Sequence, residues 1–174
     1  MNPLLPYMLP ISGLQNGVHE YTFDVDDTFF SCFDNALISS GNFNVSLRLD
    51  KRFDMMLLYF QFDGYANTEC DRCLTSIQLP LSGEQTLIVK TASAESEEDD
   101  IIYITPDTPT LDVSQYVYEI ISLTMPLIKV YDCQTTPSPP CDQSMLRYLN
   151  EQEQTTETPK DNPIWDSLKN IKYN

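Results

Sequence analysis

The sequence predicts an α+β fold in which a mostly antiparallel, twisted sheet or partly open barrel is covered by one long helix and followed by a C-terminal tail helix. Several segments alternate apolar and polar residues, as strands with one buried face do. One stretch before a proline carries apolar residues at helical spacing. Ten Tyr, eight Phe and 41% hydrophobic residues among 174 supply enough material for one packed core.

The clearest alternation predicts two neighbouring antiparallel strands. Phe43–Leu49 and Met56–Phe62 both place an apolar residue at every second position, and a polar turn separates them. We expect Gly64 to form a bend or a bulge after the second strand and before the cysteine pair. The other predicted strands are Tyr21–Val25, followed by a short helix capped within Asp26–Thr28 and running through Phe33; Ile77–Leu81 and Thr86–Lys90, a hairpin with a turn at Gly83 and an edge position at Pro80; and Ile101–Ile104.

Helical spacing appears after the strands. Asp112 is a capping residue for a long helix that runs to Met125 and is ended by Pro126. Asp142–Leu149 is a second amphipathic candidate. We therefore expect one domain over residues 1–150, an acidic linker over 151–160, and a short helix over 161–174 that either docks back on the domain or meets a partner.

The charge of the chain restricts its partners. With 10 Lys and Arg against 26 Asp and Glu, the net charge is -16, which repels phosphate backbones and anionic lipids and attracts basic proteins. Ala92–Asp100 reads as a solvated acidic loop, with metal capture by its carboxylates as the lesser alternative. Met1–Pro10 lacks the features of a signal peptide, and no stretch is long enough to span a bilayer. The sequence predicts a cytoplasmic protein.

The five cysteines are the strongest chemical signal. In a reducing compartment they are expected as thiols or metal ligands rather than disulfides. Cys70 and Cys73 form a Cys-x-x-Cys pair between strands, and Cys133 and Cys141 form a looser pair further on. Four thiolates from two loops suit a tetrahedral Zn²⁺ site, and four reduced thiols are the alternative. Cys32 lies in an aromatic run and is expected in the core.

No catalytic or cofactor-binding constellation is recognisable, and no small-molecule substrate is expected. The single histidine, His19, stands in a polar stretch without a nucleophile motif, and the phosphate-binding glycine motifs are absent from the sequence. Exposed aromatics on a sheet can stack RNA bases, which makes Tyr59, Phe60 and Tyr65 candidate platforms. Arg72, inside the cysteine turn, suits either a phosphate or a nearby carboxylate.

Several blocks in order resemble a known family. They are Glu69–Leu74, with the cysteine pair; Leu111–Val113, which opens the long helix; Leu123–Leu127; Asp132–Cys133; and Asp161–Lys169. Together they resemble the YceD family of large ribosomal RNA subunit accumulation proteins, in a Bacteroidetes-like branch. The resemblance implies a role in accumulation of large-subunit rRNA and ribosome assembly, without enzymatic activity.

The resemblance and the charge together give the functional hypothesis. The chain is expected to act as a non-enzymatic assembly factor that binds a basic ribosomal or ribosome-assembly protein and associates with large-subunit rRNA only indirectly. The alternative is a thiol-based redox or metal-handling protein built on Cys70 and Cys73, although strands rather than a helix flank this pair. The residues expected to contact a partner are Arg72, Pro163, Ile164, Trp165, Leu168 and Lys169.

Overall fold

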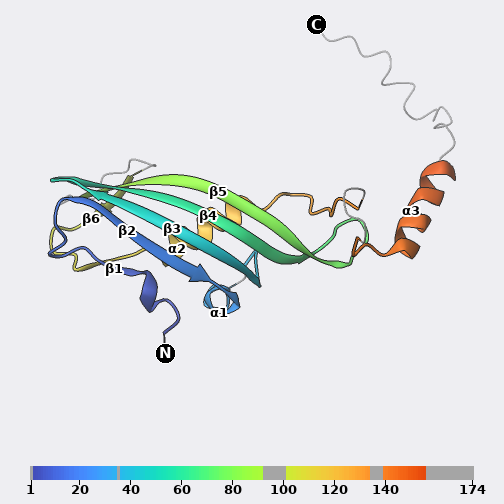
Figure 1. Ribbon diagram of the computed structural model, residues 1–174, viewed down its shortest axis with the longest axis horizontal. Helices are drawn as coiled ribbons and strands as arrows, with labels where there is room; N and C mark the ends of the chain where they lie inside the picture. Colours follow the sequence, from blue (N-terminus) through green and yellow to red (C-terminus); the bar gives the residue numbers. More distant parts are fainter. Residues whose placement is uncertain (1, 35, 92–100, 134–138, 156–174) are drawn as a thin grey trace, which may run out of the picture.

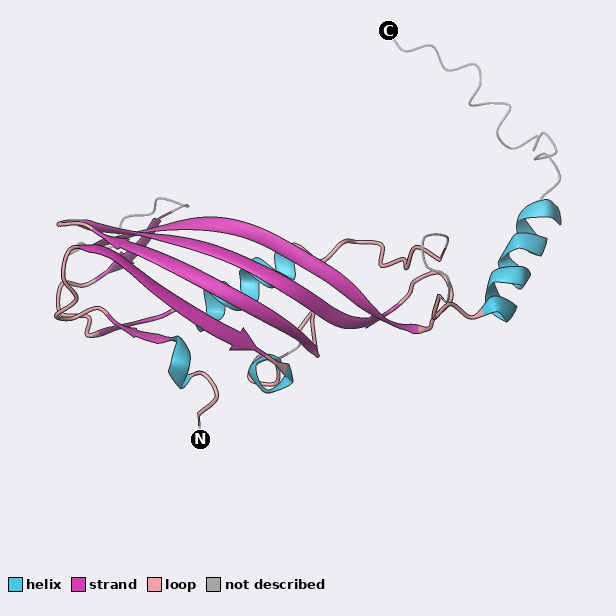
Figure 2. Cartoon of the chain, viewed as in Figure 1, coloured by secondary structure: helices cyan, strands magenta, loops and turns pink. Residues whose placement is uncertain are grey.

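The computed structural model describes residues 2–34, 36–91, 101–133 and 139–155. Within these residues the chain is α+β, as predicted, with an open sheet and few helices (Figures 1 and 2). The elements in chain order are the 3-10 turn η1 (Leu5–Tyr7), β1 (Met8–Pro10), β2 (Gly17–Val25), α1 (Asp27–Phe30), β3 (Gly41–Lys51), β4 (Met55–Glu69), β5 (Ser76–Thr91), β6 (Ile101–Ile104), β7 (Thr110–Asp112), α2 (Ser114–Leu123) and α3 (Gln143–Thr155).

The main sheet has the strand order β2-β3-β4-β5-β6. Strands β2 to β5 form an antiparallel meander, and β6 joins parallel to the end of β5. Because β2 and β6 are edges, the described strands do not close into a barrel. The short strands β1 and β7 pair separately; three residues each carry too little alternation to be recognised from the sequence.

The register gives the sheet one apolar face and one polar face. The predicted pairing of the two alternating segments is confirmed, since Val45 lies opposite Phe62 and Leu47 opposite Phe60. These residues are buried, as are Leu49 and Leu58. Side chains from α1, α2 and the N-terminal segment complete this core, which therefore lies on one side of the sheet.

The first helix begins where the sequence predicts. The Asp26 carboxylate accepts hydrogen bonds from the backbone N–H groups of Thr28 and Phe29 at 2.9 and 3.2 Å, which caps α1. The helix buries Phe29 and Phe30. The prediction that Cys32 belongs to the core is wrong: its side chain points outward and is exposed, because one turn of helix directs the phenylalanines inward instead.

The covering helix α2 is shorter than predicted. Asp112 ends β7 rather than opening the helix, although its carboxylate accepts the Ser114 N–H at 2.8 Å. From Ser114 to Leu123 the helix has ten residues and buries Val117, Ile120 and Ile121 against the sheet. The longer helix is α3, with 13 residues, which lies beyond the end of the β4–β5 hairpin and continues through Thr155 into the range predicted as linker (Figure 2).

The predicted hairpin turn at Gly83 is wrong, because Ser76–Thr91 is one continuous strand. The long neighbour β4 pairs along its whole length and carries the strand through Gly83, which lies opposite Phe62. Pro80 lies opposite Tyr65 of β4, and it is accommodated because β6 pairs only with residues 88–91, so β5 has no described partner strand at Pro80 on the side away from β4. Gly64 also lies within a strand, and its backbone is closely approached by Asn42 and Phe43 of β3.

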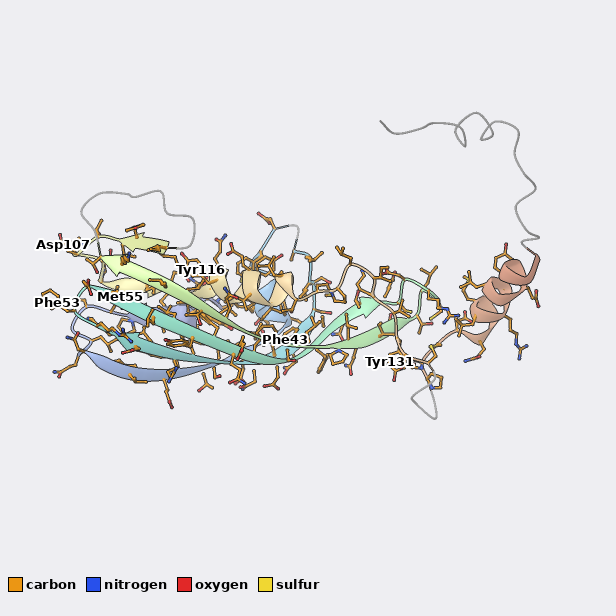
Figure 3. All side chains as sticks on the ribbon, turned by 90° about the horizontal axis from the view of Figure 1, so that it is seen from above. Phe43, Phe53, Met55, Asp107, Tyr116 and Tyr131 are labelled. Atoms are coloured by element: carbon orange, nitrogen blue, oxygen red, sulfur yellow. A yellow bond between two sulfur atoms is a disulfide. The ribbon has the colours of Figure 1, made fainter. Side chains whose placement is uncertain are left out.

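The far end of the β4–β5 hairpin extends beyond the rest of the sheet. Pairing between β3 and β4 ends at Ala66, whereas β4 and β5 remain paired out to Glu69 and Ser76. Figure 3 shows Tyr131 beside this narrow end, while Phe53 and Asp107 mark the opposite end. The predicted tail helix over 161–174 and the acidic loop Ala92–Asp100 lie outside the described residues. None of the described helices has the length and apolar character needed to cross a membrane.

Candidate functional site

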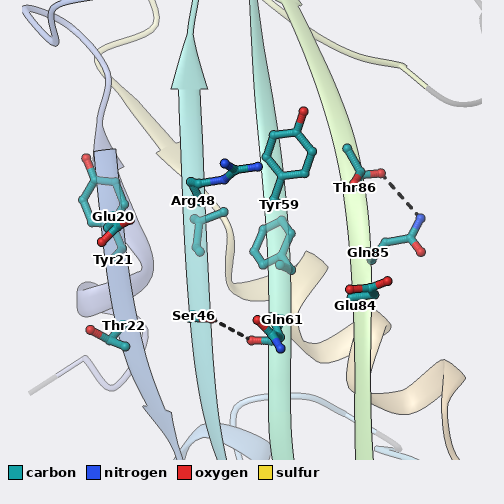
Figure 4. A pocket seen from close by; sticks show the side chains of 12 residues that line it. Glu20, Tyr21, Thr22, Ser46, Arg48, Tyr59, Gln61, Glu84, Gln85 and Thr86 are labelled. Atoms are coloured by element: carbon teal, nitrogen blue, oxygen red, sulfur yellow. Dashed lines mark hydrogen bonds between the residues drawn. The ribbon is translucent and has the colours of Figure 1, made fainter. Parts of the chain in front are cut away.

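The polar face of the sheet is hollowed. Because side chains alternate between faces, every second residue of each strand points away from the core. The resulting hollow, of about 1040 Å³, crosses β2, β3, β4 and β5 (Figure 4). Its outward rows are Thr22, Ser46, Gln61 and Glu84, and next to them Glu20, Arg48, Tyr59 and Thr86.

This surface, called the open face below, is predominantly acidic. Glu20 and Glu84 line its two sides, and the adjacent row adds the exposed carboxylates Asp24 and Asp63. Arg48 is the cation of these rows, and its guanidinium carbon lies 4.5 Å from the centre of the Tyr59 ring. The Arg48 side chain is thus held by the protein itself, and the carboxylates keep the surface negative.

The geometry of the sheet tests which of the predicted RNA-stacking residues are exposed enough to contact a base. Phe60 is 2% exposed and belongs to the core, so it is excluded as a stacking platform. Tyr59 is half-buried beneath Arg48, and Tyr65 is half-buried further along β4. Sequence reasoning did not identify the open face as a site, although the polar partners in the period-two alternation were a signal for it.

A second candidate site lies at the end of the β4–β5 hairpin and is called the cysteine tip. Cys70 and Cys73 are 1% and 3% exposed, and Cys141 is 7% exposed. They form a small cluster with Ile77, separate from the main core, against which Tyr131, Cys133, Met145 and Leu146 pack. The structure therefore brings together all four cysteines that the sequence predicts as metal ligands.

The turn at the cysteine tip is tightly hydrogen-bonded. The Cys70 N–H donates to the Thr75 carbonyl at 2.9 Å, and the Leu74 N–H donates to the Cys70 carbonyl at 2.8 Å. Leu74 has a φ of 57°, in the left-handed region that non-glycine residues seldom adopt. The backbone N–H of Thr75 donates to the Cys73 sulfur, and so does the N–H of Asp142 next to Cys141.

These bonds lower the pKa of the Cys73 thiol. The largest cause is the backbone N–H of Thr75, and the N–H of Asp142 and the Thr75 hydroxyl act in the same direction against the effect of burial. Asp142 also begins α3, because its carboxylate accepts the backbone N–H groups of Ser144 and Met145 at 2.8 and 3.3 Å. The start of α3 is thereby joined to the cysteine turn.

The second cysteine pair departs from expectation. Cys133 and Cys141 form a disulfide, with their Cα atoms 6.5 Å apart, where reduced thiols or metal ligands were predicted. Their closeness across the intervening loop makes the bond geometrically accessible. Cys70 and Cys73 are free thiols. With two sulfurs bonded to each other, no group of three or more His, Cys, Asp or Glu side chains in the described ranges is arranged to hold a metal.

Asp71, rather than Arg72, anchors the cysteine turn to the chain that follows α2. The Asp71 N–H donates to the Lys129 carbonyl at 2.7 Å, and the Asp71 carboxylate accepts the Lys129 N–H at 2.6 Å. The Lys129 ammonium lies 3.8 Å from the same carboxylate. Arg72 is exposed and has no ion pair within the described residues, so its partner-binding role stays a prediction.

The remaining predicted residues are not brought to either site. His19 is half-buried in β2, where its Nε2 lies 2.9 Å from the Gln15 carbonyl, and no nucleophile is paired with it among the described contacts. The predicted partner-binding residues Pro163, Ile164, Trp165, Leu168 and Lys169 lie outside the described part of the chain.

Comparison with known proteins gives one finding. The family model described as "Large ribosomal RNA subunit accumulation protein YceD" matches residues 58–172, about two thirds of the chain. The match takes in most of β4, the cysteine tip, α2 and α3. The search of curated proteins and the search of solved structures each return no match.

Proposed function

Since the chain belongs to the YceD family of large ribosomal RNA subunit accumulation proteins, we propose that it acts as a non-enzymatic assembly factor for the large ribosomal subunit. The family match is the observation that carries the proposal, and the family description names accumulation of an RNA and no reaction. The chain promotes accumulation of large-subunit rRNA through a ribosomal or assembly-factor protein rather than by chemistry on the RNA.

The chemistry of the partner follows from the open face. Glu20, Glu84, Asp24 and Asp63 on a solvent-exposed sheet disfavour close approach of RNA phosphates and favour Lys- and Arg-rich surfaces. The whole chain, at -16, adds long-range attraction for a basic protein. The partner is therefore a basic ribosomal or assembly protein, and contact with rRNA is indirect.

A binding experiment with purified large-subunit ribosomal proteins tests the partner's class. The tagged full-length chain is expected to retain a basic protein of the large subunit, with binding that weakens as salt rises. The double variant Glu20→Lys, Glu84→Lys should lose most of this binding. The matched control Asp54→Lys, Asp107→Lys makes the same change in net charge at exposed loop positions at the other end of the sheet from the cysteine tip and should retain it.

Two outcomes would contradict parts of this proposal. Equal loss in both charge variants would show that net charge acts without a docking face. Absence of large-subunit proteins, together with unchanged large-subunit rRNA in cells lacking the protein, would overturn the assembly role itself. Deleting residues 164–172 in the same assay tests the predicted contribution of the C-terminal segment.

The alternative, a thiol-based redox or metal-handling protein, is favoured by the free Cys70–Cys73 pair and by the lowered pKa of Cys73. Burial of both thiols opposes redox exchange, because thiolate attack on a substrate disulfide needs access. Measuring the alkylation rate of these thiols against pH separates the two. Fast alkylation near neutral pH in metal-free protein would favour the redox alternative.

A further inference from the structure

A small apolar groove lies between the end of α2 and β5. Gly83 lies opposite Phe62 and carries no side chain, so the end of α2 comes close to the strand there, with the Thr124 methyl 3.2 Å from the place that a Gly83 Cβ would take. Next to this contact the helix and the strand leave a hollow of about 230 Å³. Its lining is mostly apolar and includes Phe62, Leu87, Tyr116, Ile120 and Leu123.

The size of the groove limits what it can hold. Sites for cofactors and drug-sized ligands usually have volumes of ~300–1,000 Å³, whereas this hollow suits a single large apolar side chain. Leu123, the last residue of α2, lines the groove and is nevertheless 84% exposed. Its side chain extends the apolar surface outward from the groove, which is the character of a surface that another chain covers.

The strand that borders the groove is also open to pairing. β5 pairs with β4 over its whole length, but β6 covers the other side of β5 only at residues 88–91. Because Pro80 has no N–H, the edge available for pairing is residues 81–87, which have no second partner strand in the described part of the chain. An extended peptide can add to such an edge through main-chain hydrogen bonds while one of its side chains enters the neighbouring pocket.

Two carboxylates flank the groove. Glu84 lines it from the strand and Glu119 from the helix, and both side chains are exposed. The Glu119 carboxylate accepts a hydrogen bond from the Gln115 amide at 2.9 Å. Neither carboxylate forms an ion pair with a Lys or Arg among the described residues. Both can therefore attract cationic groups of a bound segment.

Charge distinguishes the possible occupants of the groove. Pairing the β5 edges of two copies would bring acidic edges together on chains that each carry a net charge of -16, so like charges oppose it. The chain's own residues 161–172 contain two aspartates and two lysines and are neutral overall. A segment of a basic protein supplies the complementary charge.

We propose that residues 81–87 of β5 and the adjoining groove bind an extended segment of a basic protein, in which one large apolar side chain enters the groove and flanking lysines or arginines contact Glu84 and Glu119. The inference rests on the proposed function, which supplies a basic ribosomal or assembly protein as the partner. Glu84 lines both the groove and the open face, so the two surfaces are continuous and can contact one partner.

The test is binding of a fluorescein-labelled synthetic peptide, Lys-Lys-Val-Phe-Val-Arg-Lys, to the full-length chain, measured by fluorescence anisotropy. The same peptide with Ser in place of Phe should bind ~10-fold more weakly. Leu123→Ser should weaken binding of the Phe peptide by a similar factor, because it removes one wall of the groove. Leu127→Ser, at a leucine that is 99% exposed and does not line the groove, is the matched control and should leave the affinity unchanged.

A charge variant tests the acidic flank separately. Glu119→Gln keeps the shape of the side chain and should weaken binding of the Phe peptide by ~3-fold, because it removes one exposed ionic contact. Asp107→Asn, which makes the same change in charge at an exposed loop position, should have no effect. Equal weakening by both variants would show that net charge alone attracts the peptide, and would contradict contact with Glu119.

Hydrogen exchange locates the peptide without any substitution. The bound peptide should slow amide exchange in residues 81–87, where new main-chain hydrogen bonds form, and should leave β2, the other long edge of the sheet, unchanged. Equal protection of both edges, or no protection of residues 81–87, would overturn the proposed mode of binding.

Other outcomes would assign the groove elsewhere and overturn the proposal. Higher peptide affinity after deletion of residues 164–172 would assign it to the chain's own C-terminal segment, and a wild-type dimer that Leu123→Ser dissociates in analytical ultracentrifugation would assign it to a second copy. Equal affinities of Leu123→Ser and Leu127→Ser would exclude the groove.

The two proposals can fail separately. If the chain retains large-subunit ribosomal proteins and Leu123→Ser retains them equally, the groove is not the docking site, and the assembly role stands. If the peptide binds as expected but no ribosomal protein is retained, the groove is supported as a site for basic segments, and the assembly role is contradicted.

Discussion

The sheet body and the cysteine tip are stabilised by different means. The body buries a continuous set of large apolar side chains, including the edge-to-face pairs Phe29–Phe30 and Phe43–Phe62. The tip buries three cysteines and one isoleucine and depends on a disulfide and on hydrogen bonds to Asp71 and Cys73. The body should therefore respond mainly to loss of apolar volume, and the tip to changes at sulfur.

The largest effect is expected from loss of a core ring. Phe60→Ala should lower the free energy of unfolding by ~3–5 kcal/mol, because Phe60 is buried in the centre of the sheet and its removal leaves a cavity. Ile77→Ala, at the tip, should instead speed hydrogen exchange around the cysteine turn while leaving the main unfolding transition in place. Urea denaturation and hydrogen exchange measured by mass spectrometry distinguish the two effects. Equal shifts in the urea midpoint would show that body and tip unfold as one unit.

A smaller effect is expected where two strands come closest. A Cβ at Gly64 would overlap the Asn42 carbonyl and lie 2.6 Å from the Phe43 Cα, which are backbone atoms that cannot move aside without shifting β3. Gly64→Ala should therefore cost ~1–3 kcal/mol by overpacking. Gln61→Ala, on the exposed side of the same strand, should stay within ~0.5 kcal/mol. Thermal unfolding measures both, and a neutral Gly64→Ala would contradict the close approach.

Removing the aspartate at the start of α1, in the body, and the aspartate at the start of α3, at the tip, allows the two regions to be compared directly. Asp26→Ala removes the cap of α1 and should cost ~1 kcal/mol. The hydrogen bond from the Thr28 hydroxyl is the largest cause that lowers the pKa of Asp26 below its ordinary value of 3.8. The ionised Asp26 cap therefore stabilises the fold above that pH, and this stabilisation is lost as the pH falls. Asp142→Ala should loosen α3 with little effect on the main transition. Helix-selective hydrogen exchange measures this, and a change in the exchange of α1 would contradict it.

The mildest prediction concerns Tyr7. Burial is the largest cause that raises the pKa of Tyr7 from 10.0 to about 12, and nearby Asp26 and Asp24 add to it. The raised value means that stability is fully present below pH 10 and declines as pH rises toward 12. Tyr7→Phe removes the 3.2 Å hydrogen bond to the Asp24 carbonyl, should cost ~0.5–1.5 kcal/mol, and should weaken this alkaline dependence. Ultraviolet titration of the tyrosines is the check, and an ordinary pKa for Tyr7 would contradict it.

Local patterns were sufficient to predict much of the sheet body. Period-two alternation predicted β3 and β4 with their pairing, and the run Asp26–Thr28 predicted the start of α1 without deciding which residue caps it. Gly83 misled the prediction because a glycine between two apolar runs is also the signal of a turn, and only the length of β4 shows that the strand continues. Cys32 was misplaced because the orientation of a single helical turn depends on its neighbours.

The candidate sites were predictable to different degrees. Spacing predicted that Cys70 and Cys73 share a turn. The presence of a second pair, Cys133 and Cys141, predicted that all four cysteines come together, because four thiolates from two loops suit one metal site. The disulfide between Cys133 and Cys141 depends on geometry across a loop and on oxidation state, neither of which is written in the local sequence. The open face required the register of four strands, because its acidic residues are far apart in the sequence.

The hydrogen bond from Asp142 to Cys73 also has a consequence for the order of folding. It joins residues roughly 70 positions apart, whereas the β2–β5 meander is closed by neighbouring strands, and loop closure over the longer span carries the larger entropic cost. During synthesis the whole meander leaves the ribosome before Cys141 does. The cysteine tip can therefore close only after all four strands of the meander have been synthesised.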